Sequence, residues 1–479
     1  ILGWVFVPFY TRSMVYTMPE FLERRYNPQS RTILSVISLV SYVLTKVAVT
    51  VYAGGLVFQQ VFGIKELWGI DFFWIAAIGL VVLTALYTIF GGMKSVLYTS
   101  VLQTPILLLG SLIILVLGFK ELGGWDEMMR VCGAVTVNDY GDTMTNLIRS
   151  NDDANFPWLG ALIGSAIIGF WYWCTDQFIV QRVLSGKNEM EARRGTIFGA
   201  YLKLLPVFLF LIPGMIAFAL HQKYIGAGGE GFLPMLENGT ANADAAFPTL
   251  VAKLLPAGVK GLVVCGILAA LMSSLASLFN SSAMLFTIDF YKRFRPQTSE
   301  KKLVGIGQVA TVVIVILGIL WIPIMRSVGD VLYTYLQDVQ SVLAPGIAAA
   351  FLLGICWKRT SAQGGMWGLI SGMVIGLTRL GAKVYYSNAG EVADSTFKYL
   401  FYDMNWLFFC GWMFLFCIIV VIVVSLATEA PTAEKIQGLV FGTATKEQKA
   451  STRASWNHWD IIHTVIILAI TGAFYWYFW

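Results

Sequence analysis

The stretch Thr196–Leu220, TIFGAYLKLLPVFLFLIPGMIAFAL, is apolar over 25 residues, and a helix that spans a bilayer needs about 20. Lys203 is its only charge. An ammonium at that depth costs about 3 kcal/mol or more and usually faces a protein interior or a water-filled cavity. Two other apolar spans carry polar groups, namely Trp171–Gln177 (WYWCTDQ) with its carboxylate and the pair Ser273-Ser274. Polar groups in three spans predict a solute pathway rather than a simple anchor.

The composition indicates a polytopic membrane protein. Of 479 residues, 57% are apolar and 13% are charged, with a mean hydropathy of +0.70, whereas soluble proteins have about 25% charged residues. We find no phosphate-binding glycine loop, no basic stripe, no metal-spaced Cys/His set and no catalytic set. The sequence therefore argues against a nucleic-acid partner and against an enzyme.

Apolar periodicity predicts about eleven full helices and a partial one in a single transmembrane domain, residues 1–479. The expected spans are 33–62, 72–90, 98–119, 157–181, 195–222, 256–287, 303–326, 331–356, 364–386, 398–427 and 459–478. The stretch Ile1–Tyr10 is apolar but too short to span a membrane. We interpret it as the end of a helix whose beginning is missing, so we expect an N-terminally truncated chain.

Several of these spans are expected to be interrupted. Pro206 and Pro213 fall in the span that holds Lys203, and Pro345-Gly346 is expected to split the span 331–356. At 171–177, aromatic, Cys and Thr residues replace the aliphatic run. Membranes tolerate broken helices where protein or cavity water satisfies the exposed backbone, and such breaks near the midplane are typical of transporter sites.

Loop charges predict the orientation. Basic residues gather in loops 11–31, 182–194, 292–302, 358–359 and 435–453, which share one side if the helices alternate. The opposite side has the acidic loop 120–156. The positive-inside rule places the basic loops in the cytoplasm. We therefore expect a multi-pass protein of the cell membrane with its C-terminus outside.

Each candidate residue in the spans has a functional and a structural interpretation. Lys203 offers three donors to a sugar hydroxyl or a carboxylate, or it pairs with Asp176 and joins two helices. The aromatic pair Tyr172 and Trp173 would stack on a sugar face, or it packs at a kinked helix. Asp176 and its neighbour Gln177 accompany these aromatics; the carboxylate alternatively caps the broken helix or faces the cytoplasmic vestibule.

The remaining candidates also have both a functional and a structural interpretation. Gln337 both donates and accepts hydrogen bonds, which suits sugar hydroxyls, or it joins helices. Tyr333, one turn earlier, either covers the cavity or belongs to the interfacial aromatic belt. Ser273 and Ser274 would ligate a small hard cation, but small-residue helix packing also explains them and is favoured on spacing alone. Lys46 lines the cavity or extends to the inner interface, and we favour the structural role.

The chain resembles the sodium/solute symporter family, specifically its sodium–glucose cotransporter branch, over essentially its whole length. The matching stretches include VYTMPEFLERRY (15–26), WYWCTDQFIVQRVLSGKN (171–188), YLKLLPVFLFLIPGMI (201–216) and LAALMSSLASLFNSSAMLFTIDFYK (268–292). The resemblance implies an all-α LeuT-type fold, with ten core helices in two inverted repeats and extra helices. The first core helix would be absent from this chain. The cysteine-rich insertion of animal members is missing, which points to a bacterial source.

The resemblance also implies residue roles in sugar binding and gating. Lys203 and Gln337 match the sugar-binding lysine and glutamine of the family. Tyr172 matches the inner gate beneath the sugar, with Trp173 beside it, and Tyr333 matches an outer-gate aromatic. The implied function is sodium-coupled symport of a glucose- or galactose-like sugar into the cell. The alternatives are a myo-inositol or sugar-acid symporter, or a non-transporting sugar sensor of the same fold.

A sodium site is implied on the span 256–287. Ala270, Ser273 and Ser274 match the sodium ligands that the fold shares, so the resemblance changes our interpretation of the serines from packing to ion binding. Many relatives have Asp where this chain has Ser100, and that aspartate belongs to a second sodium site. We therefore expect about one sodium ion per solute here, because a neutral hydroxyl is a weaker cation ligand than a carboxylate.

Overall fold

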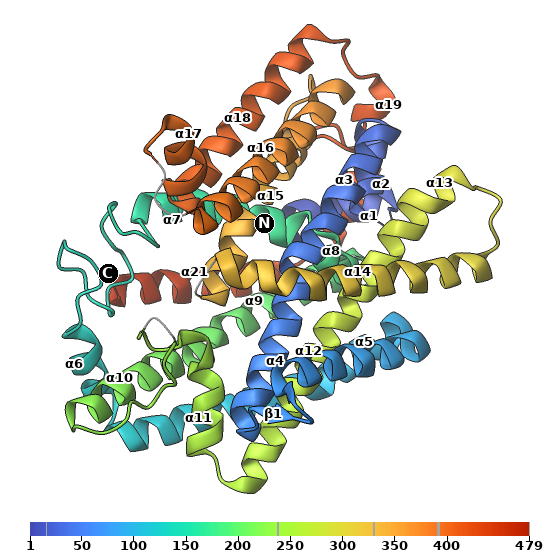
Figure 1. The fold of residues 1–479 in the computed structure, drawn as a ribbon. Helices are drawn as coiled ribbons and strands as arrows, with labels where there is room; N and C mark the ends of the chain where they lie inside the picture. The colour runs from blue at the N-terminus through green and yellow to red at the C-terminus, as the bar shows by residue number, and fades with distance from the viewer. Residues whose placement is uncertain (16, 237–238, 329–330, 390–392, 479) are drawn as a thin grey trace. The chain divides into compact units, whose positions relative to one another are not determined.

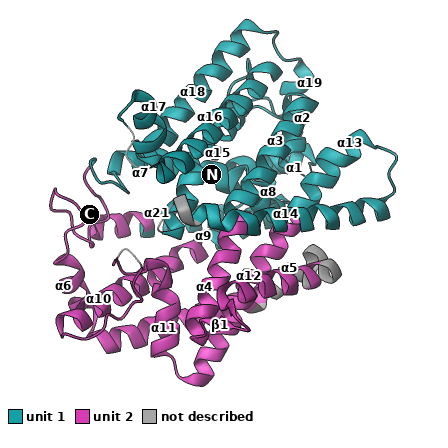
Figure 2. Ribbon diagram, in the orientation of Figure 1, with its two compact units in different colours: residues 1–45, 151–200, 281–470 teal, residues 46–150, 201–280, 471–479 magenta. Residues whose placement is uncertain are grey.

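The computed structural model describes residues 1–15, 17–236, 239–328, 331–389 and 393–478, which are mostly helical (Figure 1). The chain divides into two compact units, coloured separately in Figure 2. Unit 1 comprises residues 1–45, 151–200 and 281–470, and unit 2 comprises residues 46–150, 201–280 and 471–479. Helices α9, α12 and α21 pass from one unit into the other.

Unit 1 contains most of the helices. Their bounds are η1 Leu2–Phe6, α1 Val7–Ser13, α2 Met18–Arg25, α3 Pro28–Ser41, α7 Trp158–Cys174, α8 Gln177–Leu184, α9 Glu189–Pro206, η5 Leu285–Tyr291, α13 Lys292–Phe294, α14 Glu300–Val328, α15 Leu332–Cys356, α16 Ala362–Asn388, α17 Thr396–Lys398, η6 Tyr399–Asp403, α18 Trp406–Ala427, α19 Ala433–Ile436, α20 Lys446–Ala454 and α21 His458–Tyr477.

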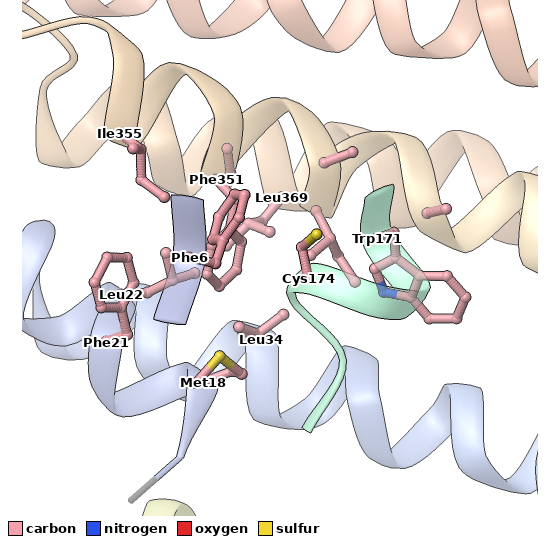
Figure 3. Close-up of a cluster of buried hydrophobic side chains, with 14 of the residues drawn as sticks. Phe6, Met18, Phe21, Leu22, Leu34, Trp171, Cys174, Phe351, Ile355 and Leu369 are labelled. Atoms are coloured by element: carbon pink, nitrogen blue, oxygen red, sulfur yellow. The ribbon is translucent and has the colours of Figure 1, made fainter. Parts of the chain in front are cut away.

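The core of unit 1 is built from α7, α15, α16 and α18, which pack against one another. Figure 3 shows part of its apolar cluster, where Phe351 of α15 lies near Phe6, Phe21 and Leu22. The Phe21 and Phe351 rings are stacked with centroids 5.9 Å apart. Within a membrane, close packing of this kind holds helices together, so this cluster joins the short N-terminal helices to α15.

Glycines allow α15 and α16 to approach closely. A Cβ on Gly376 would lie 2.2 Å from the backbone oxygen of Val342, and a Cβ on Gly372 would lie 2.7 Å from the Cα of Gly346. Small residues at membrane helix interfaces permit this kind of backbone contact. The contact leaves no room for any larger side chain on that face of α16.

A buried arginine joins α2 to the end of α15. Arg25 is fully buried, and its guanidinium donates to the backbone oxygens of Gly354 (2.6 Å) and Thr360 (3.1 Å). Because the last carbonyls of a helix lack intrahelical partners, a cation there satisfies them and complements the helix dipole. Burial lowers the pKa of Arg25, and it raises the pKa of the neighbouring Tyr26 to about 12.

Unit 2 is built around α4, α5, α10 and α11, with α12 contributing apolar side chains to its core. Its elements are η2 Tyr42–Val47, which begins in unit 1, α4 Ala48–Phe62, β1 Glu66–Leu67, β2 Ile70–Asp71, α5 Phe72–Leu122, α6 Trp125–Gly133, η3 Val207–Leu211, α10 Ile212–Gly226, η4 Ala243–Ala245, α11 Ala246–Leu254 and α12 Ala257–Met284.

Eight helices in the described part of the chain are long and apolar enough to cross a membrane, or nine if the bent pair α7 and α8 forms one span. The other two expected spans correspond to the shorter apolar helix Phe72–Leu86 and to α16. Helix α16 is long enough, but six glycines and two cations lower its hydropathy. The expectation of eleven full helices in one domain stays a prediction.

Two sequence expectations are wrong in detail. Pro345-Gly346 does not split its span, because α15 is continuous from Leu332 to Cys356. Proline is tolerated in membrane helices whose neighbours support the backbone, and Pro345 is buried where Gly346 packs on α16. The spans 72–90 and 98–119 form the single helix α5, although its apolar segments, Phe72–Leu86 and Gln103–Leu122, follow the expected division.

Candidate functional site

The expected interruption at 171–177 is a bend of 45° between α7 and α8. Asp176 caps α8, because its Oδ1 accepts a hydrogen bond from the backbone N–H of Phe178 at 3.1 Å. The Thr175 hydroxyl donates to the backbone oxygen of Trp171 at 2.9 Å. Asp176 therefore has the capping role that was one of its alternatives in the sequence analysis, and side chains satisfy the polar backbone that the bend exposes.

Two buried tyrosines hold the bend from outside α7 and α8. The Tyr42 hydroxyl donates to Asp176 Oδ1 at 3.1 Å and accepts from the N–H of Phe178 at 3.0 Å. The Tyr10 hydroxyl donates to the backbone oxygen of Cys174. Neither contact was expected from the sequence, because each tyrosine is more than 130 residues away along the chain from the residue that it binds.

Gln177 lies at the start of α8. Its Oε1 accepts a hydrogen bond from the backbone N–H of Met18 at 2.8 Å. That N–H belongs to the first turn of α2, where backbone donors have no intrahelical partner. Its Nε2 lies 3.7 Å from the sulfur of Met284. Gln177 thus joins α8 to the start of α2.

The aromatic residues before the bend differ in burial. Trp171 is 3% exposed and belongs to the cluster in Figure 3, so it is a packing residue. Tyr172 is half-buried and Trp173 is 40% exposed, and their ring centroids are 5.2 Å apart at an interplanar angle of 83°. The two expected substrate aromatics therefore form an edge-to-face pair at the last turn of α7.

Gln337 and Tyr333 lie one turn apart on α15 and bind each other. Gln337 Nε2 donates to the Tyr333 hydroxyl at 3.0 Å. Tyr333 is 56% exposed, and Gln337 is half-buried. Residues four apart on a helix are neighbours on its surface, so the structure brings together the expected sugar-binding amide and the expected outer-gate aromatic.

A partly buried charge cluster next to Gln337 was missed by the sequence analysis. The carboxylate of Asp338 pairs with Lys383, and its Oδ1 lies 3.7 Å from the fully buried Arg379. Arg379 also donates to the backbone oxygen of Met404 at 2.7 Å and lies 4.1 Å over the Phe409 ring. Two cations four residues apart in an apolar span were the sequence signal for this cluster.

The two expected lysines belong to unit 2. Lys203 is an exposed residue on α9, three residues before Pro206 ends that helix and the π-helical segment η3 begins. Lys46 is half-buried in the π-helical segment η2. π-helical turns inside α-helices are frequent at functional sites. Both lysines therefore lie at or next to irregular helical turns.

The three expected sodium ligands lie on α12. Ser273 is buried and Ser274 is exposed, as befits adjacent helical positions that point in different directions, and Ala270 is half-buried. The Ser273 hydroxyl is 2.6 Å from the hydroxyl of Ser100 on α5. Ser100, the residue expected to replace an aspartate, is thus a direct hydrogen-bond partner of an expected sodium ligand.

Comparisons with known proteins agree on one family. The model of the sodium:solute symporter family matches residues 1–372. The sodium/mannose cotransporter SLC5A10 of Bos taurus is 36% identical over 100% of this chain and 82% of its own length. Sodium/myo-inositol cotransporter 2 of Homo sapiens is 36% identical over 92% of this chain, and sodium/glucose cotransporter 1 of Ovis aries is 38% identical over 90%. The chain spans 66% of the length of each of the latter two.

A solved structure has a similar fold. The substrate-bound, outward-open state of a Na⁺-coupled sialic acid symporter matches 90% of this chain and 81% of its own with a TM-score of 0.65 and 20% sequence identity. This likeness confirms the all-α membrane fold of the LeuT type. The relatives are cotransporters and not enzymes.

Proposed function

Because this chain belongs to the sodium:solute symporter family, we propose that it carries a glucose- or galactose-like sugar into the cell together with sodium by alternating access. The observation that supports a sugar is the 36–38% identity to mannose, myo-inositol and glucose cotransporters across at least 90% of this chain. A cotransporter moves its solute by exposing a central site to each side in turn. We propose that the protein lies in the cell membrane with its C-terminus outside.

Sugar binding is proposed to involve Lys203, Gln337, Tyr172 and Trp173. The hydrogen bond between Gln337 and Tyr333 supports this proposal, because a half-buried amide and an exposed phenol can exchange their mutual bond for bonds to sugar hydroxyls. The edge-to-face pair of Tyr172 and Trp173 offers a flat apolar surface with one polar tip. Tyr172 would close beneath the sugar and Tyr333 above it.

The coupling sodium ion is proposed to bind α12 at Ala270, Ser273 and Ser274. A serine hydroxyl has one donor and two acceptor sites. Ser273 can therefore donate to Ser100 and still offer oxygen lone pairs to a hard cation. Because Ser100 is neutral, we propose a stoichiometry of about one sodium ion per solute. Sodium and sugar must raise each other's affinity equally, since coupling is reciprocal.

A second candidate solute is myo-inositol or a sugar acid. A myo-inositol cotransporter is as similar to this chain as the mannose cotransporter is, at 36% identity. The cation of Lys203 would suit a carboxylate as well as a hydroxyl. A non-transporting sugar sensor of the same fold would bind sugar without accumulating it.

The test is uptake of labelled glucose, galactose and myo-inositol into proteoliposomes, with and without an inward sodium gradient, using the full-length protein. We expect sodium-driven accumulation of glucose or galactose. Accumulation of myo-inositol alone would favour the second candidate. Binding of glucose to the purified protein without accumulation would contradict transport and favour the sensor.

A further inference from the structure

A cationic cavity of about 370 Å³ lies in unit 1, and none of its lining residues is discussed above as a sugar or sodium ligand. It is lined by Arg12 and Ser13 of α1, by Arg24 of α2, and by residues of α19, of the segment 437–439 that follows it and of α20. Helix α19 contacts α2, as Figure 1 also shows. The volume of the cavity is near the lower limit for small-molecule pockets. The cavity therefore suits a compact group such as a lipid headgroup rather than a large ligand.

The lining is positively charged. Arg12, Arg24 and Lys435 contribute three cations, and Glu434 is the one carboxylate among the lining residues. Lys435 Nζ donates a hydrogen bond to the backbone oxygen of Glu23 at 3.0 Å, and this acceptor is not a carboxylate. Arg24 pairs with Glu20 at 3.2 Å, but its side chain is 45% exposed, and solvent weakens exposed pairs of this kind. The cavity therefore keeps a net positive charge.

One donor in the lining has no hydrogen-bond partner in the described structure. The Nε atom of Arg12 is buried and unsatisfied, while its Nη2 donates to the Thr452 hydroxyl at 2.6 Å. The planar guanidinium of an arginine suits the oxygens of a phosphate particularly well.

The wall formed by residues 437–448 is held in place by its own hydrogen bonds. The backbone N–H of Gly438 donates to the Thr443 hydroxyl at 3.0 Å, and Gly438 has φ of +75°, which favours glycine. Thr445 and Gln448 form a capping box at the start of α20. The cavity is thus a formed site rather than a gap between free side chains.

We propose that this cavity binds a phosphate group, carried either by an anionic lipid headgroup or by a soluble phosphate. Its cations belong to the basic loops that the positive-inside rule assigns to the cytoplasm, where anionic lipids attract Lys and Arg near the membrane surface. The proposal does not depend on which solute is transported, because its test measures binding and not uptake.

The experiment uses the purified full chain in a neutral detergent and two probes. Labelled inorganic phosphate tests the soluble source by equilibrium binding. Retention of labelled phosphatidic acid by the immobilised protein, with the lipid added in mixed micelles of the same detergent and labelled phosphatidylcholine as the background, tests the lipid source. We expect binding to at least one probe, and we expect it to weaken as the salt concentration rises, since screening shortens the reach of charges.

Arg12→Gln and Lys435→Gln should each weaken binding roughly fivefold, the effect of one cation near an anionic surface. The matched control is Lys449→Gln, which removes the same charge from an exposed position on α20 that does not line the cavity, and it should leave binding unchanged. If Arg12→Gln fails to fold, Arg24→Gln at the exposed rim replaces it. Equal binding by wild type, Arg12→Gln and Lys435→Gln would overturn the proposal. Binding of neither probe above the phosphatidylcholine background would overturn it as well.

Discussion

The contact between α15 and α16 predicts that Gly376→Ala destabilises unit 1. The added Cβ would lie 2.2 Å from the backbone oxygen of Val342, whereas ordinary contacts begin near 3.4 Å. The obstacle is backbone, so α15 and α16 must separate by about 1 Å, and overpacking of this kind typically costs about 1–3 kcal/mol. The separation would also loosen the neighbouring contact between Gly346 and Gly372.

Thermal unfolding of the purified protein, followed by tryptophan fluorescence, measures this effect. Gly381→Ala is the matched control, because it lies on the same helix and its Cβ would meet no heavy atom within 4 Å. Alanine favours a helix over glycine by about 1 kcal/mol, so the control should leave the midpoint unchanged or raise it. A Gly376→Ala midpoint equal to that of Gly381→Ala would refute the reasoning about the close contact.

Three further predictions concern transport. Lys203→Ala should weaken sugar binding by about 2 kcal/mol, roughly thirtyfold, because it removes a charged hydrogen-bond donor; an unchanged dissociation constant in equilibrium binding would contradict its assigned role. Ser274→Ala should abolish the sodium dependence of uptake, and uptake that still follows the sodium gradient would point to another ion site. Ser100→Asp should raise the ratio of sodium to solute fluxes from about one towards about two, because a carboxylate beside Ser273 adds a charged ligand; an unchanged ratio would argue against a latent second site.

Much of the fold could be predicted from local sequence patterns. Apolar runs of the right length gave the membrane helices, and the loss of aliphatic residues at 171–177 gave the bend between α7 and α8. The rule for proline gave a wrong result at Pro345, because it describes an isolated helix. Contacts with α7, α16 and α18 support the backbone of α15 there, and no local pattern encodes such support.

The candidate site was predictable only in part, and for a physical reason. The spacing of Tyr333 and Gln337 puts them on one face of any helix, so their hydrogen bond follows from sequence. The partners of Ser273 and Asp338 come from distant segments, and tertiary packing alone decides which hydroxyl or cation meets them. The assignment of sugar and sodium contacts to these residues stays a prediction.

The hydrogen bonds of Tyr10 and Tyr42 at the bend restrict how the angle between α7 and α8 can change. A helix break is commonly thought of as a hinge, but here Tyr10 and Tyr42 tie its two sides to the N-terminal segments at Cys174 and Asp176. Any opening of the angle must first break buried hydrogen bonds, each of which costs about 1–3 kcal/mol to leave unmade. The angle between α7 and α8 is therefore expected to stay fixed. Tyr172 would then move together with both helices, and the conformational change would take place at other positions in the chain.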